Sequence, residues 1–396
     1  MDPVKRNVAL LSACQGLLLC NAVTLVTVNS LVGYQLAADK RLATLPVTGY
    51  VIGTTLATLP AAHFMKRYGR RNGFMLGCGL GIAGGLVCVL AVWLHSFWLL
   101  CLGTVLAGAY NAFGLQYRFA AADLASSDWK AKAISFTLAG GILGGVLGPE
   151  TGKLTRDLLA IPFMGSYAAL AGFALLAMLI TSFLRIPPLP VAEQRGTGRS
   201  LATIARQPAF LVAVACAALG YGAMNLLMSS TPLAMDLCGL SFAETAPVFE
   251  WHVIGMYAPS FFTGSLIRRF GVLQVMLGGA ACMFACVGVA VSGQSLSQFW
   301  GALLLLGIGW NFLYIGGTTL LTETYATSER AKVQGSNDFI VFGLQGISSV
   351  SSGAVLIHSG WTTLNLLILP MVLLAALSAS WLLWLRRNRA LPQGAG

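Results

Sequence analysis

Charged residues are scarce in this chain: Lys and Arg number 24, Asp and Glu 13, and together they make up 9% of the 396 residues. Soluble domains contain about 25% charged residues, so the composition excludes an ordinary soluble domain. The 4 histidines lie in separate segments. The sequence also lacks a His-Glu-x-x-His pair, a Gly-x-Ser-x-Gly elbow and a phosphate-binding glycine loop. We therefore predict that the chain is not an enzyme and holds no metal or other cofactor.

Apolar residues are abundant, at 57%. They form repeated runs of roughly 20 residues, which is long enough for a helix to cross the hydrocarbon of a bilayer. The runs do not alternate apolar and polar residues, as the strands of a membrane barrel would. The sequence thus predicts an all-α membrane protein with twelve transmembrane helices. Their predicted ranges are 8–32, 44–65, 74–94, 98–120, 134–152, 161–184, 208–230, 246–267, 273–292, 298–320, 334–357 and 362–385.

Basic residues are concentrated on one side of the predicted membrane. If the N-terminus is cytoplasmic, nineteen Lys and Arg residues lie on that side and four lie outside, namely Lys40, Arg41, Lys153 and Arg156. This asymmetry follows the positive-inside rule. It predicts a multi-pass protein of the inner (cytoplasmic) membrane, embedded in lipid, with both termini cytoplasmic. It also explains the net charge of +11 without a nucleic-acid partner.

The two halves of the chain repeat one another at an offset of about 200 residues. Lys66-Arg67-Tyr68-Gly69 returns as Arg268-Arg269-Phe270-Gly271, and Tyr110-Asn111 returns as Trp310-Asn311. We predict a six-helix bundle at 1–184, a cytoplasmic linker at 185–207 and a second six-helix bundle at 208–396. A parallel repeat of this kind is typical of rocking-bundle transporters, with the substrate site between the halves. Such a carrier is self-contained, so we expect a monomer.

Two motifs make the chain resemble the major facilitator superfamily. The loop signature Gly-x-x-x-Asp-Arg-x-Gly-Arg-Arg aligns with residues 62–71, with Lys66 in place of the usual Asp. The signature Gly-x-x-x-Gly-Pro-x-x-Gly is present as Gly144, Gly148, Pro149 and Gly152. The Arg of the helix 4 signature is absent, since Thr104 occupies that position. The resemblance implies a secondary transporter that works by alternating access, coupled to protons.

The same resemblance bears on substrate and direction. The glycine motif of helix 5 is associated with exporters in that family, but it also suits close helix packing whichever way a solute moves. The stretch 117–123 resembles a bacterial subgroup that includes flavin carriers. Export of a small organic solute is therefore the first hypothesis. Import of an aromatic nutrient such as a flavin is the alternative, and a membrane receptor or sensor that does not transport is a third.

In this family the central cavity is lined by helices 1, 4, 7 and 10. The midpoints of those helices carry aromatic and uncharged hydrogen-bonding residues, which suit a ring-bearing or amphipathic small molecule. Arg118 adds a possible partner for a substrate anion. Polar contacts between helices are the alternative interpretation. The predicted substrate-binding residues are Asn21, Tyr110, Asn111, Arg118, Tyr221, Asn225, Trp310, Asn311 and Tyr314.

Charges inside a bilayer are costly and usually functional. Asp338 is predicted to close a cytoplasmic gate by pairing with Lys66 or Arg67, or else to stabilise the N-terminus of its helix. Asp123 and Glu323 occupy matching positions. They are expected to bind the basic loops 66–71 and 268–269, the second of which includes Arg268, or else to be solvated charges at the membrane interface.

Glu250 and His252 lie near the outer end of the eighth predicted helix. A partly buried carboxylate or imidazole can exchange a proton near neutral pH, so these two residues are candidates for proton coupling. The alternative is that both reach the outer headgroup region.

Overall fold

The computed structural model describes residues 2–39, 42, 45–187 and 198–390. Lys40, Arg41 and residues 188–197 of the predicted linker lie outside the described residues. Helices dominate the described part of the chain, and it contains no strand. Two compact units can be separated by their internal contacts. Residues 1–198 and 327–342 form the first, and residues 199–326 and 343–396 form the second.

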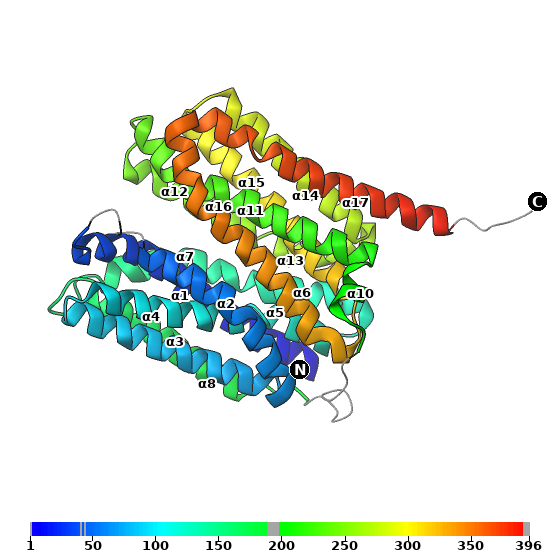
Figure 1. Cartoon of the computed structure of the whole chain (residues 1–396), viewed down its shortest axis with the longest axis horizontal. Coiled ribbons are helices and arrows are strands. Elements are labelled where there is room, and N and C mark those ends of the chain that lie inside the picture. The colour runs from blue at the N-terminus through cyan, green and yellow to red at the C-terminus, as the bar shows by residue number, and fades with distance from the viewer. Residues whose placement is uncertain (1, 40–41, 43–44, 188–197, 391–396) are drawn as a thin grey trace, which may run out of the picture. The chain divides into compact units, whose positions relative to one another are not determined.

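The first unit is a helical bundle (Figure 1). Within it α4 packs against both α2 and α3, and α1 packs against α7 and α8. Its helices are α1 (Pro3–Leu36), α2 (Leu45–Tyr68), α3 (Arg70–Trp93), α4 (Phe97–Gly114), α5 (Tyr117–Leu124), α6 (Lys130–Ala139), α7 (Gly141–Thr155) and α8 (Met164–Ser182).

The second unit is also helical, and α15 lies against α11, α12 and α14. One further helix, α16 (Arg330–Leu366), begins in the first unit and continues in the second from Gly343. The remaining helices are α10 (Leu201–Ala205), α11 (Pro208–Leu237), α12 (Phe242–Tyr257), α13 (Ser260–Phe270), α14 (Val272–Ser292), α15 (Leu296–Leu321) and α17 (Leu369–Ala390).

Ten stretches of the described chain are long and apolar enough to cross a membrane. One of them, Thr327–Asn388, contains both α16 and α17, and α16 is itself kinked at Gly360, which has a non-helical φ of 77°. Together α12 and α13 cover the eighth predicted span, 246–267. The helix is interrupted there at Ala258 and Pro259. The ten stretches and this pair fit the predicted fold, and the predicted all-α class is confirmed.

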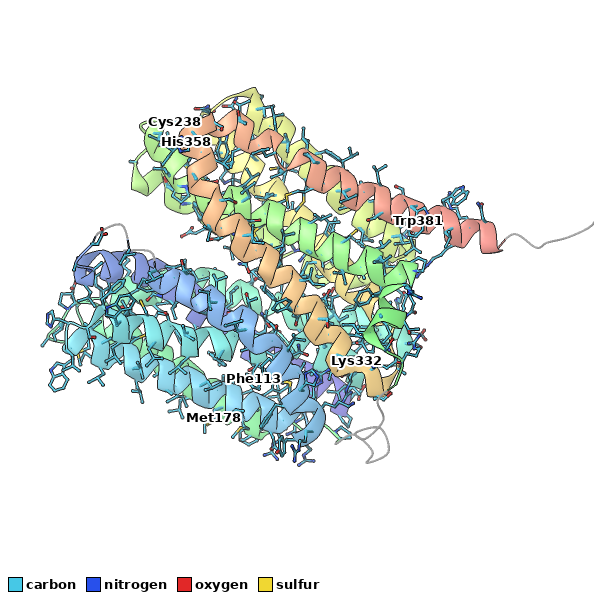
Figure 2. All side chains as sticks on the ribbon, in the orientation of Figure 1. Phe113, Met178, Cys238, Lys332, His358 and Trp381 are labelled. Atoms are coloured by element: carbon cyan, nitrogen blue, oxygen red, sulfur yellow. The ribbon has the colours of Figure 1, made fainter. Side chains whose placement is uncertain are left out.

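The surface of both units suits lipid. Large apolar side chains are well exposed, among them Trp98 at 68% and Val350 at 73%. Figure 2 shows such side chains along the helices, including Trp381 of α17. In water such broad apolar exposure would favour aggregation, whereas in a bilayer it is the required surface.

Glycines let helices of each unit approach closely. A Cβ on Gly108 would overlap the backbone carbonyl of Tyr50, and a Cβ on Gly307 would come 2.5 Å from the carbonyl of His252. The first contact joins α4 to α2 and the second joins α15 to α12. The repeat seen in the sequence is thus also a repeat in packing, because small residues serve the equivalent helix pair in each half.

The predicted glycine motif lies on α7. A Cβ on Gly144 would overlap Leu19 of α1, and one on Gly148 would come 2.9 Å from Val23. The carbonyl of Gly152 accepts a hydrogen bond from Ser166 at 3.4 Å, and Pro149 lies within the same helix. The first two glycines therefore bring α7 against α1.

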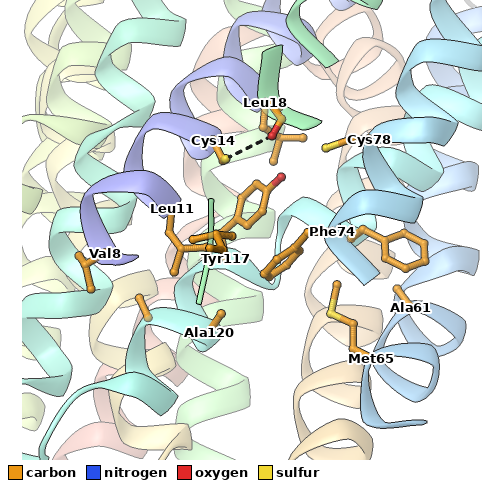
Figure 3. Packing of buried hydrophobic residues seen from close by; sticks show 14 of the residues in the cluster. Val8, Leu11, Cys14, Leu18, Ala61, Met65, Phe74, Cys78, Tyr117 and Ala120 are labelled. Carbon is orange, nitrogen blue, oxygen red and sulfur yellow. Dashed lines mark hydrogen bonds between the residues drawn. The ribbon is translucent and has the colours of Figure 1, made fainter. Parts of the chain in front are cut away.

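The interior of the first unit is apolar with a few soft polar groups (Figure 3). Leu11, Phe74 and Tyr117 are fully buried there, and the rings of Phe74 and Tyr117 lie 4.6 Å apart. The thiol of Cys14 lies 3.8 Å from the carbonyl oxygen of Ala177. This packed core supports the short helix α5, which carries the polar residues described next.

Candidate functional site

Three residues of α16 form a polar stripe along one helix face: Arg330, Gln334 and Asp338. Their spacing of four residues places them one above another. All three belong to the first unit. Each bonds to a side chain from the first half of the sequence, so the polar stripe of α16 is where the two halves of the sequence meet within this unit.

Asp338 forms an ion pair with Arg118 of α5. The side chains of Arg118 and Asp338 are 1% and 0% exposed. Asn337 donates a hydrogen bond to the same carboxylate at 3.0 Å, and Gln116 donates one at 3.1 Å. A buried charge is tolerated only when it is paired and hydrogen-bonded, and this carboxylate meets both conditions.

Arg70, the first residue of α3, forms the second ion pair. Its guanidinium donates to Asp123 at 2.6 Å, and the side chains are 5% and 19% exposed. It also donates to Gln334 of the polar stripe at 2.7 Å. Arg330 completes this end of the site, because it lies 3.0 Å from the same oxygen of Asp123.

The predicted partners of the gate residues need correction. Asp338 is bound by Arg118, where the sequence had predicted Lys66 or Arg67. Lys66 is half-buried, while Arg67 is exposed and lies over the ring of Tyr68 at 5.2 Å. Asp338 lies two turns into α16, where the guanidinium of Arg118 reaches its carboxylate. Arg118 is therefore occupied by a protein carboxylate and is no ready partner for a substrate anion.

Asp123 does bind the loop 66–71, through Arg70. Glu323, which was predicted to bind the loop 268–269, pairs with Arg386 of α17 at 2.7 Å, with side chains 46% and 41% exposed. Arg268 is exposed at the end of α13. The matching positions of Asp123 and Glu323 thus have different partners in the two units.

An aromatic cluster lies inside the second unit. Trp310 and Tyr314 of α15 stack with ring centroids 4.8 Å apart and an interplanar angle of 20°. Tyr221 of α11 meets both rings edge-on at 5.3 Å, and Tyr257 of α12 meets Trp310 at 5.7 Å. Trp310 is 2% exposed, and its indole N–H has no hydrogen-bond partner among the described residues. Tyr221 is only half-buried.

The predicted asparagines are used in helix packing. Asn311 is fully buried and donates to the carbonyl of Met256 and the hydroxyl of Ser260, both at 2.6 Å, while Thr263 donates to it at 2.7 Å. Asn111 makes the equivalent contact in the first unit, to Thr54 of α2 at 3.3 Å. Both residues join the helix pairs that the glycines bring together.

Two further asparagines also bond across helices. Asn21 donates to the carbonyl of Leu170 in α8 at 2.9 Å, and Asn225 donates to the carbonyl of Gln345 in α16 at 3.2 Å. Tyr110 is buried at 1%, and a Cβ on Gly81 of α3 would come 2.6 Å from its ring. Of the nine predicted substrate residues, the structure brings three together: Tyr221, Trp310 and Tyr314.

Glu250 and His252 lie apart in environment although they are close in sequence. Glu250 is exposed, whereas His252 is fully buried. The Nδ1 of His252 donates to the carbonyl of Leu303 at 2.7 Å, because a carbonyl can only accept. Its Nε2 has no partner among the described residues.

The sequence interpretation missed Gln116, Gln334 and Arg330 as members of the site, and it included Arg70 only as one residue of the loop 66–71. One signal was available. Arg118 and Asp338 are opposite charges inside predicted membrane helices, and buried ions in a bilayer pair with one another. The repeat offered a second signal, since the counterparts of Asp338 and Gln334 are Leu138 and Ile134.

Comparison with known proteins agrees with this architecture. A sequence model of the Major Facilitator Superfamily matches residues 11–343. The riboflavin transporter RfnT of Brucella anthropi is 40% identical over 373 residues, covering 93% of this chain and 94% of that protein. YddS of Bacillus subtilis, an uncharacterized MFS-type transporter, is 30% identical over 376 residues, covering 88% and 86%.

Solved structures share the fold. The human organic anion transporter MFSD10 (TETRAN) has a TM-score of 0.79 at 14% identity, covering 96% of this chain and 100% of that chain. The E. coli fucose:proton symporter FucP has a TM-score of 0.75 at 18% identity, covering 94% and 98%. The resemblance found in the sequence motifs is confirmed, and the chain belongs to the Major Facilitator Superfamily as a multi-pass membrane transporter.

Proposed function

We propose that this protein carries riboflavin, or a flavin with the same ring system, into the cell across the cytoplasmic membrane by alternating access. The observation that carries the proposal is the 40% identity to a riboflavin transporter over 93% of the chain. This places the flavin hypothesis ahead of the export of an unspecified solute. The proposed carrier acts as a monomer of two six-helix bundles.

The aromatic cluster of the second unit supports this substrate. The isoalloxazine ring of riboflavin is large, planar and uncharged, and aromatic side chains bind such rings by stacking and edge contacts. Trp310 adds a buried N–H that lacks a partner among the described residues, and a flavin carbonyl is a suitable acceptor. Neither α15 nor residues 208–235 of α11 contain a charged residue. The cluster therefore suits a neutral ring better than an ion.

The polar stripe of α16 is proposed as the cytoplasmic gate. Its three residues bond to Asp123, Arg70 and Arg118, and two of those bonds lie in a buried setting. Separating Asp338 from Arg118 would leave two uncompensated buried charges unless water or protons replaced the partner. Such an ion pair is stable when formed. When α16 moves, each charge must therefore gain a new partner in place of the old one. Proton coupling remains part of the proposal, with Asp338 and His252 as its candidate residues.

Uptake of labelled riboflavin tests the proposal. The chain would be expressed in a riboflavin-requiring bacterium that lacks its own flavin carrier, and accumulation would be followed over time. Growth at low external riboflavin and saturable uptake are expected. Trp310→Ala should abolish uptake, while Trp98→Ala, which alters a tryptophan 68% exposed on α4, is the matched control and should keep it.

The direction of transport is tested in the same cells. The glycine motif at 144–152 favours export in the resemblance drawn from sequence, so export is the second candidate. Cells preloaded with labelled riboflavin would lose it faster when an exporter is expressed. Faster loss without uptake would replace import by export, and neither uptake nor loss would remove riboflavin as the substrate. An ionophore that collapses the proton gradient should slow uptake if protons drive it.

A further inference from the structure

Gln116 lies between the two ion pairs of the site. It occupies the short turn between α4 and α5, with the φ and ψ of a helical residue, and it is 1% exposed. Its amide oxygen accepts a hydrogen bond from Arg70 at 3.1 Å, and its amide nitrogen donates one to Asp338 at 3.1 Å. One neutral side chain thus bonds to the cation of one pair and the anion of the other.

We propose that Gln116 is a positioning residue that couples the two pairs, so that Arg70–Asp123 and Arg118–Asp338 form and separate together. The inference goes beyond the proposed substrate and does not depend on it. When Asp338 leaves Arg118, the amide nitrogen of Gln116 loses its acceptor in a buried place. When Arg70 moves, the amide oxygen loses its donor. A buried polar group without a partner is costly, so the loss of either pair weakens the position of the other.

The direction of the amide matters to this coupling. The amide nitrogen donates to the carboxylate of Asp338 and stabilises its negative charge. The amide oxygen accepts from the guanidinium of Arg70 and stabilises its positive charge. Hydrogen bonds in a chain polarise one another in a low-dielectric setting. A side chain of the same length without an amide would fill the same volume but could not transmit this effect.

The second half of the chain lacks this device. The repeat counterparts of Gln116 and Arg118 are Gly316 and Thr318, and those of Gln334 and Asp338 are Ile134 and Leu138. Only the peripheral members keep their character, since Asp123 matches Glu323 and Arg330 matches Lys130. The buried, coupled part of the gate therefore belongs to one side of the pseudo-symmetric fold.

A double-mutant cycle tests the coupling without any substrate. Asp123→Asn and Asp338→Asn would be made singly and together, and the midpoint of thermal unfolding would be measured for each purified protein. Gln116 bonds to Arg70 of one pair and to Asp338 of the other, so we expect the combined shift to differ from the sum of the single shifts. The cycle is then repeated in a Gln116→Met background, where the shifts should become additive.

Gln334→Met provides the matched background. It removes the other amide bonded to Arg70 but leaves the link from Arg70 to Asp338 through Gln116, so the non-additivity should persist there. If Gln116→Met does not yield folded protein, Gln116→Asn serves instead, because an amide one methylene shorter cannot reach both partners. A residue that merely fills space would leave the non-additivity unchanged. Additive shifts in the native background, or persistent coupling in both Gln116 variants, would overturn the proposal.

Discussion

The guanidinium of Arg118 lies on the carboxylate of Asp338, although 220 positions separate the two residues in the chain. Neither side chain is more than 1% exposed. An ion pair this deep contributes little net stability by itself, because desolvation opposes the Coulomb attraction. The pair matters mainly when it is broken, because loss of one partner leaves the other charge buried without compensation.

Removal of one charge should therefore harm the protein more than removal of both. Arg118→Met leaves a buried carboxylate with two amide donors and no cation, and we expect a loss of about 3–5 kcal/mol in the free energy of unfolding. Arg118→Met combined with Asp338→Leu replaces the pair by apolar side chains and should recover most of that loss. Thermal or denaturant unfolding of the purified proteins measures both. A double variant as unstable as Arg118→Met would show that the pair itself, and not the unpaired charge, carries the stability.

The same double variant separates stability from transport. It lacks the exchangeable contact of the proposed gate, so riboflavin uptake should remain low although the fold is restored. Uptake at the native rate would contradict the proposal that the polar stripe of α16 is the gate.

The second prediction concerns the affinity for riboflavin and the indole N–H of Trp310. Trp310→Phe keeps an aromatic ring beside Tyr314 but deletes the donor, so we expect the Kd of riboflavin to rise about tenfold, which corresponds to about 1.4 kcal/mol. Trp310→Ala removes the stacking as well and should raise it further. Quenching of flavin fluorescence on titration with purified protein gives Kd directly. Equal Kd for Trp310→Phe and the native protein would mean that the N–H does not contact the ligand.

Much of the fold was predictable because the hydrophobic runs and the basic loops are encoded in local composition, and the repeat is found by comparing the two halves of the sequence. The pairing of Arg118 with Asp338 was not, because nothing local specifies which residues of distant helices face one another. Helix geometry also limits how many neighbours one face can hold. Trp310 and Asn311 are adjacent, so their side chains leave the helix about 100° apart. The structure accordingly places Trp310 in the aromatic cluster and Asn311 against α12 and α13.

A break between two helices explains another difference between the sequence prediction and the structure. Asn111 and Arg118 both fall within the single predicted helix 98–120. In the structure α4 ends at Gly114 and α5 begins at Tyr117. The intervening turn redirects Arg118 toward α16 and places Gln116 between the ion pairs. No proline marks this break, so the sequence did not predict that the helix ends before Arg118.

The asparagines yield a third prediction, about stability. Asn311→Ala deletes three buried hydrogen bonds and leaves the hydroxyls of Ser260 and Thr263 without that partner. Asn111→Ala deletes one bond of 3.3 Å at a half-buried position. With about 0.6 kcal/mol for an average interhelical hydrogen bond, Asn311→Ala should cost about 2 kcal/mol and Asn111→Ala less than half of that. The unfolding midpoints of the two variants give the comparison. Equal losses would argue that Asn311 has a role other than packing.

Helix contact through glycine leads to a fourth prediction, and the first unit supplies its own control. At Gly108 an added Cβ would overlap the backbone of α2, whereas at Gly172 of α8 no atom lies within 4 Å of the added carbon. Backbone cannot yield as a flexible side chain can, so Gly108→Ala must separate α4 from α2. It would also disturb the hydrogen bond that Thr54 donates to the carbonyl of Gly108 at 3.1 Å.

Gly108→Ala is expected to lower the unfolding midpoint and the yield of folded protein, at a cost in the range of about 1–3 kcal/mol that is typical of overpacking. Gly172→Ala should be neutral or slightly stabilising, since alanine has the better helix propensity by roughly 1 kcal/mol. Size-exclusion chromatography and thermal unfolding in detergent measure both variants side by side. If Gly108→Ala behaves like Gly172→Ala, then α2 and α4 are free to separate, and the helix pair of each half would be a moving part of the carrier and not a rigid one.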